Sequence, residues 1–370
     1  MTLGQLTASA RRLALVGLAK NTGKTVALAA LLRELEQARR TVGVTSVGRD
    51  GEEHDVIDAR ISKPRIELAA GSLVATTDSL LRASGIPSEL LAQTGVRTPL
   101  GEVLIARLRG PGAIEVAGPS AAAEIRRVSD AMLGFGAEQV LIDGAIDRRA
   151  ASSPDVADGL VMSTGAVLSE DIEEVVARTA EAVELVRLPP VSADSAAAPR
   201  IRELAQRTDL GAGLLIGEDP DDSVPLPARF VLTAEPPLID GFLSQGVPPR
   251  WLLVRGALPE AFLDGLMPFV RRSRSPLTVI VADPTRVFIS ARGVGFYARA
   301  GISIETLKEI DLRALTVNPQ APRSHGFDSG RLRGMLGEAI PGLQIFDVMD
   351  PSYAAPAATG LPAGGGTPDR

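Results

Sequence analysis

The alternation of apolar and polar positions is clearest near the start of the chain. Residues 13–19 form an almost continuous apolar run, which is typical of a strand buried on both faces. A glycine-containing loop follows, and after it apolar residues recur at the spacing of one helix face: Leu28, Leu31, Leu32 and Leu35. The pattern therefore predicts a buried strand, a tight loop and an amphipathic helix, in that order.

The loop has the sequence Gly17-Leu-Ala-Lys-Asn-Thr-Gly23-Lys24-Thr25. Its last three residues fall where the helix begins, and there the N–H groups lack backbone partners and the helix dipole is positive. Such a place favours a phosphate; Lys24 adds a cation, and the Thr25 hydroxyl can reach Mg²⁺. The usual phosphate loop has about four residues between its glycines, whereas five separate Gly17 from Gly23. The alternative is an ordinary strand–turn–helix connection with a surface lysine.

Short apolar runs and helical patterns continue to alternate as far as residue 188. Strands are expected at 41–47, 63–68, 72–77, 139–144 and 159–165, and helices at 78–83, 121–133 and 169–188. A hairpin is expected between 102–108 and 113–117, because Arg109-Gly-Pro-Gly112 is a strong turn signal, and Ser120 is expected to cap the following helix. The alternation predicts an α/β fold with a mostly parallel sheet and helices on both faces.

A stretch rich in Pro, Ala and Ser divides the chain. It suggests a nucleotide-binding domain at 1–188, a linker at 189–199, a second α/β region at 200–350 and a disordered tail at 351–370. In the second region, strands are expected at 213–216, 230–233, 251–255, 277–282, 314–317 and 343–348, and helices at 259–271, 291–300 and 329–339.

Composition narrows the class of protein. The 370 residues are 45% hydrophobic and 23% charged, which is ordinary for a globular chain, and a net charge of −6 gives no reason to expect nucleic acid as a partner. No apolar run is long enough to cross a membrane. Cysteine is absent, which excludes disulfides, thiolate metal sites and a cysteine nucleophile and makes a cytoplasmic location the simplest expectation.

Two acidic positions are candidate Mg²⁺ ligands. Asp143 ends the apolar strand at 139–144, where nucleotide-binding folds place a carboxylate; the alternative is a turn or cap aspartate. Asp50 lies in an acidic turn after the strand at 41–47, and the carboxyl ends of such strands are where open α/β sheets bind ligands. Which acid of this turn would reach the metal stays open among Asp50, Glu52, Glu53 and Asp55, and a solvated surface turn is the alternative.

Asn318 follows the expected strand at 314–317. Its amide both donates and accepts hydrogen bonds, so it can read the edge of a nucleobase, although a turn residue before Pro319 is the more ordinary interpretation. The guanine-selecting Asn-Lys-x-Asp pattern is absent, which favours ATP over GTP.

The spacing of Gly17 to Thr25 resembles the phosphate loop of dethiobiotin synthetase. Asp143-Gly-Ala is similar to that family's acid-Gly-Ala segment, with aspartate in place of glutamate, and Asn318 lies in a segment similar to the one that contacts adenine there. The resemblance implies a P-loop NTPase fold in which the nucleotide contacts Gly17, Asn21, Thr22, Gly23, Lys24, Thr25 and Asn318.

A longer series of segments resembles the P-loop subunit of the lysine 5,6-aminomutase reactivase. It comprises 17–25, 45–52, 63–66, 117–120, 141–145 with Asp147 and Arg148, and 316–319. This resemblance implies an ATP hydrolase that works with a MutS-like partner subunit and restores an adenosylcobalamin-dependent aminomutase whose cofactor is damaged.

Three hypotheses follow for the function. The first is a P-loop ATPase that acts as a reactivation chaperone, with Lys24 on the phosphates, Thr25 and Asp143 on Mg²⁺, and Asp50 or a neighbour near the γ-phosphate. The second is an ATP-dependent ligase or kinase of the dethiobiotin-synthetase type, acting on a small carboxylate or amine. The third is a regulator that binds nucleotide without useful hydrolysis.

Overall fold

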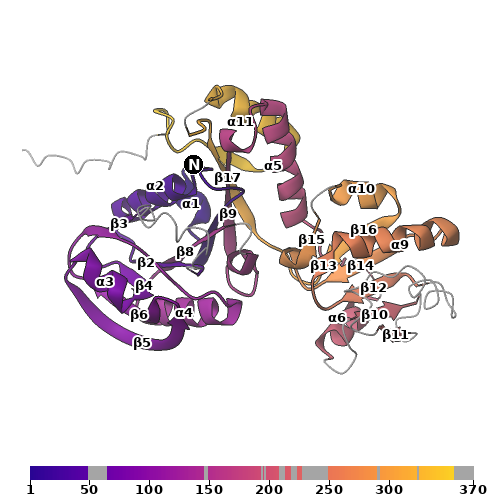
Figure 1. Ribbon diagram of the computed structural model, residues 1–370, viewed down its shortest axis with the longest axis horizontal. Coiled ribbons are helices and arrows are strands. Elements are labelled where there is room, and N and C mark those ends of the chain that lie inside the picture. The colour runs from indigo at the N-terminus through magenta and orange to yellow at the C-terminus, as the bar shows by residue number, and fades with distance from the viewer. Residues whose placement is uncertain are drawn as a thin grey trace, which may run out of the picture.

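A nine-stranded sheet forms the larger part of the molecule in a computed structural model (Figure 1). The structure describes residues 1–48, 65–145, 149–192, 195, 197–207, 213–217, 223–226, 249–289, 292–322 and 325–353. The strand order is β18-β17-β9-β1-β8-β2-β4-β6-β5. The strands are β1 (Arg12–Gly17), β2 (Val42–Ser46), β4 (Leu73–Thr77), β5 (Ser88–Thr98), β6 (Gly101–Leu108), β8 (Gln139–Ala145), β9 (Gly159–Gly165), β17 (Leu312–Asn318) and β18 (Gln344–Phe346).

Pairing is parallel from β18 to β4, and β6 and β5 add an antiparallel edge. The sheet is therefore mostly parallel, as the sequence predicted. Its helices are α1 (Leu3–Thr7), α2 (Lys24–Gln37), α3 (Asp78–Ser84), α4 (Ala122–Gly134), α5 (Ile172–Val186) and α11 (Ser329–Ala339).

Each face of the sheet packs on its own set of helices. Successive side chains of a strand point to opposite faces, and β1 shows this directly. Leu13 and Leu15 join the core formed with α1 and α2, whereas Ala14 and Val16 join the core formed with α4, α5 and α11. Burial on both faces explains why residues 13–19 read as a continuous apolar run and confirms the expectation of helices on both faces.

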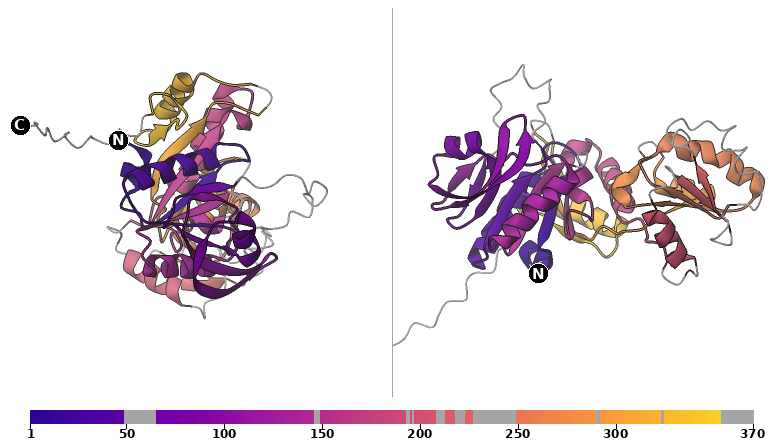
Figure 2. Two further views of the ribbon diagram at one scale, coloured as in Figure 1. Left: turned by 90° about the vertical axis from the view of Figure 1, so that its left-hand side faces the viewer. Right: turned by 90° about the horizontal axis from the view of Figure 1, so that it is seen from below.

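A second, smaller α/β unit is inserted between α5 and β17 (Figures 1 and 2). Its five-stranded sheet has the order β11-β10-β12-β14-β16. The strands are β10 (Gly213–Ile216), β11 (Ser223–Leu226), β12 (Trp251–Val254), β14 (Leu277–Val281) and β16 (Ile302–Thr306), and the helices are α6 (Ala198–Gln206), α9 (Glu260–Ser273) and α10 (Val294–Arg299). Shorter elements are β3 (Ile66–Leu68), β7 (Gly112–Ile114), β13 (Leu258–Pro259), β15 (Val287–Phe288), η2 (Arg149–Ser152), η3 (Ala166–Leu168) and η5 (Pro284–Arg286).

The expected domain boundaries need correction. The segments at 314–317 and 343–348, expected in the second region, form β17 and β18 of the large sheet. The expected linker ends inside structure, since α6 begins at Ala198 and Val191 is buried. At the other end, Tyr353 packs against Phe346, so the chain is still ordered two residues beyond the expected start of the tail. A local apolar pattern does not specify which sheet a strand joins.

Two local expectations were also wrong. Residues 101–108 and 112–114 do not form a hairpin with each other, because β6 pairs with β4 and β5 while β7 pairs with β3. The sequence reading missed β5, which supplies the hairpin partner of β6. Ser120 does not cap α4; Ala121 is the N-cap and provides no side-chain hydrogen bond. The strand expected at 230–233 lies outside the described residues.

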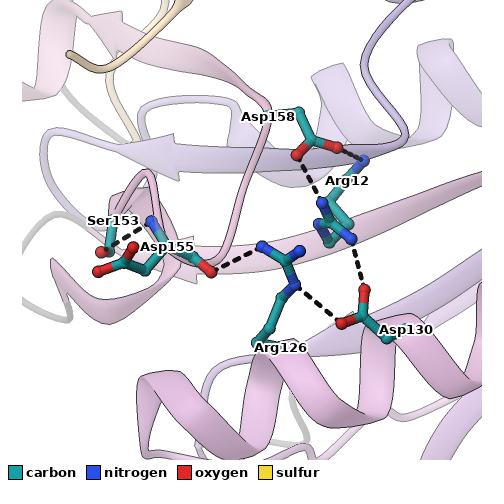
Figure 3. Close-up of polar contacts among 6 residues, drawn as sticks. All are labelled: Arg12, Arg126, Asp130, Ser153, Asp155 and Asp158. Atoms are coloured by element: carbon teal, nitrogen blue, oxygen red, sulfur yellow. Dashed lines mark hydrogen bonds and ion pairs between the residues drawn. The ribbon is translucent and has the colours of Figure 1, made fainter. Parts of the chain in front are cut away.

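The amino end of β1 is held by a buried arginine (Figure 3). Arg12 pairs with Asp130 of α4 and, at 2.7 Å, with Asp158, which also accepts the Arg12 backbone N–H at 2.9 Å. Arg126 reaches the same Asp130 at 2.9 Å. These contacts join β1 to α4 and to the residue before β9, and so hold in place the strand that leads into the glycine-containing loop.

Candidate functional site

The loop between β1 and α2 curls tightly over the carboxyl edge of the sheet. Gly23 is the N-cap of α2 and has φ +86°, and Asn21 is also left-handed with φ 68°. A side chain at Gly17 would place its Cβ 2.5 Å from Thr22 Oγ1, so glycine is required there for the loop to close. The predicted strand–loop–helix arrangement is confirmed.

The backbone N–H groups at the head of α2 are unpaired. No residue that the structure describes accepts a hydrogen bond from the N–H of Thr22, Gly23, Lys24 or Thr25. Consecutive N–H groups in a left-handed turn at a helix start form a concavity that binds anions. The loop is therefore shaped to receive a phosphate-like group.

Lys24 and Asp143 meet beside this loop. β8 pairs directly with β1, with Gly17 opposite Ala145, so the carboxyl end of β8 lies next to the start of the loop. Lys24 Nζ lies 2.8 Å from Asp143 Oδ1 and donates to the Gly144 carbonyl at 2.5 Å. The two residues that were singled out on separate stretches of sequence thus form an ion pair.

The residues at this position fit a magnesium ion. Asp143 Oδ1 is buried and, apart from its ion pair with Lys24, accepts no hydrogen bond of good geometry from any described residue. The half-buried Thr25 hydroxyl, one residue after Lys24, has no partner among the described residues. No group of three or more potential metal ligands occurs among those residues. Mg²⁺ commonly takes one or two protein ligands together with substrate phosphates and water, and Asp143 and Thr25 could supply them.

Asn318 also reaches the loop, from the end of β17. Its Nδ2 donates to the Asn21 carbonyl at 3.0 Å, and its Oδ1 accepts the Gln320 N–H at 3.2 Å. A Cβ at Gly23 would lie 2.9 Å from Asn318 Cβ. Both ends of the Asn318 amide are therefore already hydrogen-bonded, one to the loop and one within its own turn. In this structure the amide stabilises the loop and is not positioned to contact a nucleobase.

The acidic turn with Asp50, Glu52, Glu53 and Asp55 lies outside the described residues. The strand before it is β2, whose Ser46 is opposite Asp143 of β8. The Gly48 N–H then donates to the Pro119 carbonyl at 2.9 Å. The last described residue before the turn therefore follows a strand that ends at the same edge of the sheet as Asp143.

Ser163 is a supporting residue that the sequence reading missed. Its carbonyl accepts the Leu18 N–H at 2.9 Å, and its hydroxyl shares a 2.7 Å hydrogen bond with Thr316 of β17. Both hydroxyls are buried, and they join β9, the neighbour of β1, to β17 on its far side. The sequence does contain a sign of this contact, because a serine and a threonine each interrupt an otherwise apolar strand.

None of the described helices has the length and apolar character needed to cross a bilayer. Comparisons with protein families, curated proteins and solved structures found no match to this chain.

Proposed function

We propose that this chain is a Mg²⁺-dependent P-loop ATPase that binds the triphosphate of ATP at Gly17–Thr25. The supporting observation is the row of N–H groups at the head of α2 that have no acceptor among the described residues, with Lys24 and Asp143 paired beside it. The alternative, an ordinary turn with a surface lysine, does not account for a half-buried ion pair between Lys24 and the Asp143 carboxylate of the neighbouring strand. We place this activity in the cytoplasm.

The ion pair suggests how the site works. The loop N–H groups and Lys24 bind phosphate oxygens, and this contact replaces the bond between Lys24 and Asp143. Asp143 and Thr25 are the residues that would hold Mg²⁺, which neutralises charge on the phosphates. Asn318 keeps the loop in its phosphate-binding shape through Asn21. Asp50 or another acid of its turn remains a proposed neighbour of the γ-phosphate.

The test is ATP affinity measured by calorimetry with and without Mg²⁺. Lys24→Ala removes a charged hydrogen-bond donor and should weaken ATP binding by about ten- to a hundredfold in either condition. Asp143→Asn frees Lys24, so binding without Mg²⁺ should be kept or strengthened while Mg²⁺-dependent hydrolysis is lost.

Lys20→Ala is the matched control, because Lys20 is an exposed lysine of the same loop. It should leave affinity within about twofold, as expected for a surface charge. The proposal would be abandoned if Lys24→Ala bound ATP like the parent protein, or if both lysine variants lost affinity equally.

The reactivation role is a more specific proposal. It rests on the series of segments, from 17–25 through 316–319, that resembles the P-loop subunit of the lysine 5,6-aminomutase reactivase. In it, a MutS-like partner subunit and an adenosylcobalamin-dependent aminomutase stimulate a slow ATPase. The second candidate is a dethiobiotin-synthetase-like ligase or kinase for a small carboxylate or amine, supported by the five-residue spacing between Gly17 and Gly23.

Substrate dependence separates these two roles. Steady ATP turnover by the purified chain with one small carboxylate or amine, and no second protein, would support the ligase or kinase. ATP turnover that rises only when the aminomutase and partner subunit are added would support reactivation.

A further inference from the structure

A cleft of about 450 Å³ lies between the large sheet and the inserted unit. One wall comes from the sheet face and α5, and the other from η5, from Ile289 just after β15 and from the start of α10. α5 contacts both η5 and α10, and in Figure 1 this helix runs from the large unit toward the inserted unit. The volume is within the range of sites for small molecules, about 300–1,000 Å³.

The walls of the cleft are mostly aliphatic. Representative residues from both units are Val16, Leu160, Ala182, Leu185, Ile289 and Val294. Such walls favour the apolar body of a ligand, because its transfer from water removes apolar surface on both sides.

Among the described residues, two charged side chains line the cleft, and they differ in their partners. Arg178 pairs with Glu174 and donates to the Leu168 carbonyl at 2.9 Å, so its charge is already neutralised. Glu181, one turn further along α5, has no hydrogen-bond or ion-pair partner among the described residues. The carboxylate lies beside Gly293 of the opposite wall, since its Oε1 is 3.9 Å from the position of a Gly293 Cβ. Among the described lining residues, Glu181 is therefore a negative charge without a paired cation.

We propose that this cleft binds a small molecule with an apolar body and a primary amine, whose ammonium pairs with Glu181. The ligand contacts both units at once, and so favours the arrangement in which they lie together. It also contacts Val16, the residue directly before Gly17, which places this second site on the strand that leads into the loop. The inference depends on the cleft alone and not on nucleotide binding.

The experiment uses two probes with the same apolar body, phenylbutylamine and phenylbutanoate, titrated into the full chain and followed by ligand-observed NMR. The amine should bind saturably and at least about threefold more tightly than the carboxylate, the preference that a partly exposed ion pair supplies. Glu181→Gln should remove this preference. Glu184→Gln is the matched control, because it removes the same charge from an exposed position of α5 that does not line the cleft.

A second variant, Ala182→Phe, fills the cleft and should weaken both probes. Lys24→Ala should leave amine affinity unchanged even where ATP affinity is lost, so the two proposals fail separately. The inference is wrong if neither probe saturates, if the carboxylate binds as tightly as the amine, or if Glu184→Gln acts like Glu181→Gln.

Discussion

Replacing Arg12 with methionine tests whether the amino end of β1 is held by its ion pairs. Methionine keeps an unbranched apolar side chain in the buried position and removes only the guanidinium with its charge. The change leaves Asp130 and Asp158 without their shared cation, although Asp158 still accepts the backbone N–H of residue 12.

The expected loss follows from the exposure of the three side chains. The Arg12 side chain is 11% exposed, whereas those of Asp158 and Asp130 are 34% and 47% exposed. Removing one partner of a fully buried pair costs about 3–5 kcal/mol. Because water can hydrate both remaining carboxylates, we expect a smaller decrease in the free energy of unfolding, about 2–3 kcal/mol.

Urea unfolding followed by far-ultraviolet circular dichroism is the appropriate assay. The single tryptophan, Trp251, lies in the inserted unit and does not report on β1. Arg126→Met is the control, because Arg126 contacts the same Asp130 but its side chain is 41% exposed, and it should cost less than about 1 kcal/mol. The reasoning would be refuted if the two variants lost equal free energy of unfolding, or if Arg12→Met lost less than about 0.5 kcal/mol. Either result would mean that the Arg12 ion pairs contribute no more than an exposed surface pair does.

Further predictions concern the tyrosines and the loop. Burial, and secondarily a hydrogen-bonded carboxylate, raises the pKa of both Tyr297 and Tyr353 above the ordinary 10.0. The stability that this shift contributes is therefore complete below pH 10, and it decreases as the pH rises above 10 toward the raised pKa. Absorbance titration of the native chain should show no phenolate forming near pH 10; a midpoint there would contradict the burial. Tyr353→Phe removes the donor to the buried Glu34 carboxylate and should cost about 1–3 kcal/mol in urea unfolding; an unchanged free energy of unfolding would contradict this. Gly23→Ala should cost about 1–2 kcal/mol in the same assay, because the residue is left-handed and packed on Asn318; an unchanged midpoint would show that the loop relaxes freely.

The local parts of the site were predictable because their signals lie within a few residues of one another. The apolar run at 13–19, the glycines and the helical leucines specify the strand, loop and helix in one continuous segment. The sequence places Asp143 at the end of an apolar strand, and in the structure its Oδ1 lies 2.8 Å from Lys24 Nζ.

The parts that failed depend on contacts between distant segments. Residues 101–108 have the alternation of a strand, but a local pattern does not say that β4 and β5, rather than β7, are their partners. For Asn318, the sequence offered a base-reading amide or a turn residue, and only the folded chain brings its Nδ2 to the Asn21 carbonyl, 297 positions away.

By itself, the sequence determined the kind of each element and which polar residues stand at strand ends, since periodicity and capping act over one or two turns. The tertiary structure decided which strands share a sheet, returning the chain to the large sheet at β17 after the inserted unit. It also decided that Lys24 contacts Asp143, and that a cleft lies between the two units with Glu181, which has no partner among the described residues, on its wall. These arrangements depend on long-range packing between surfaces from distant parts of the chain, which no short window of residues contains.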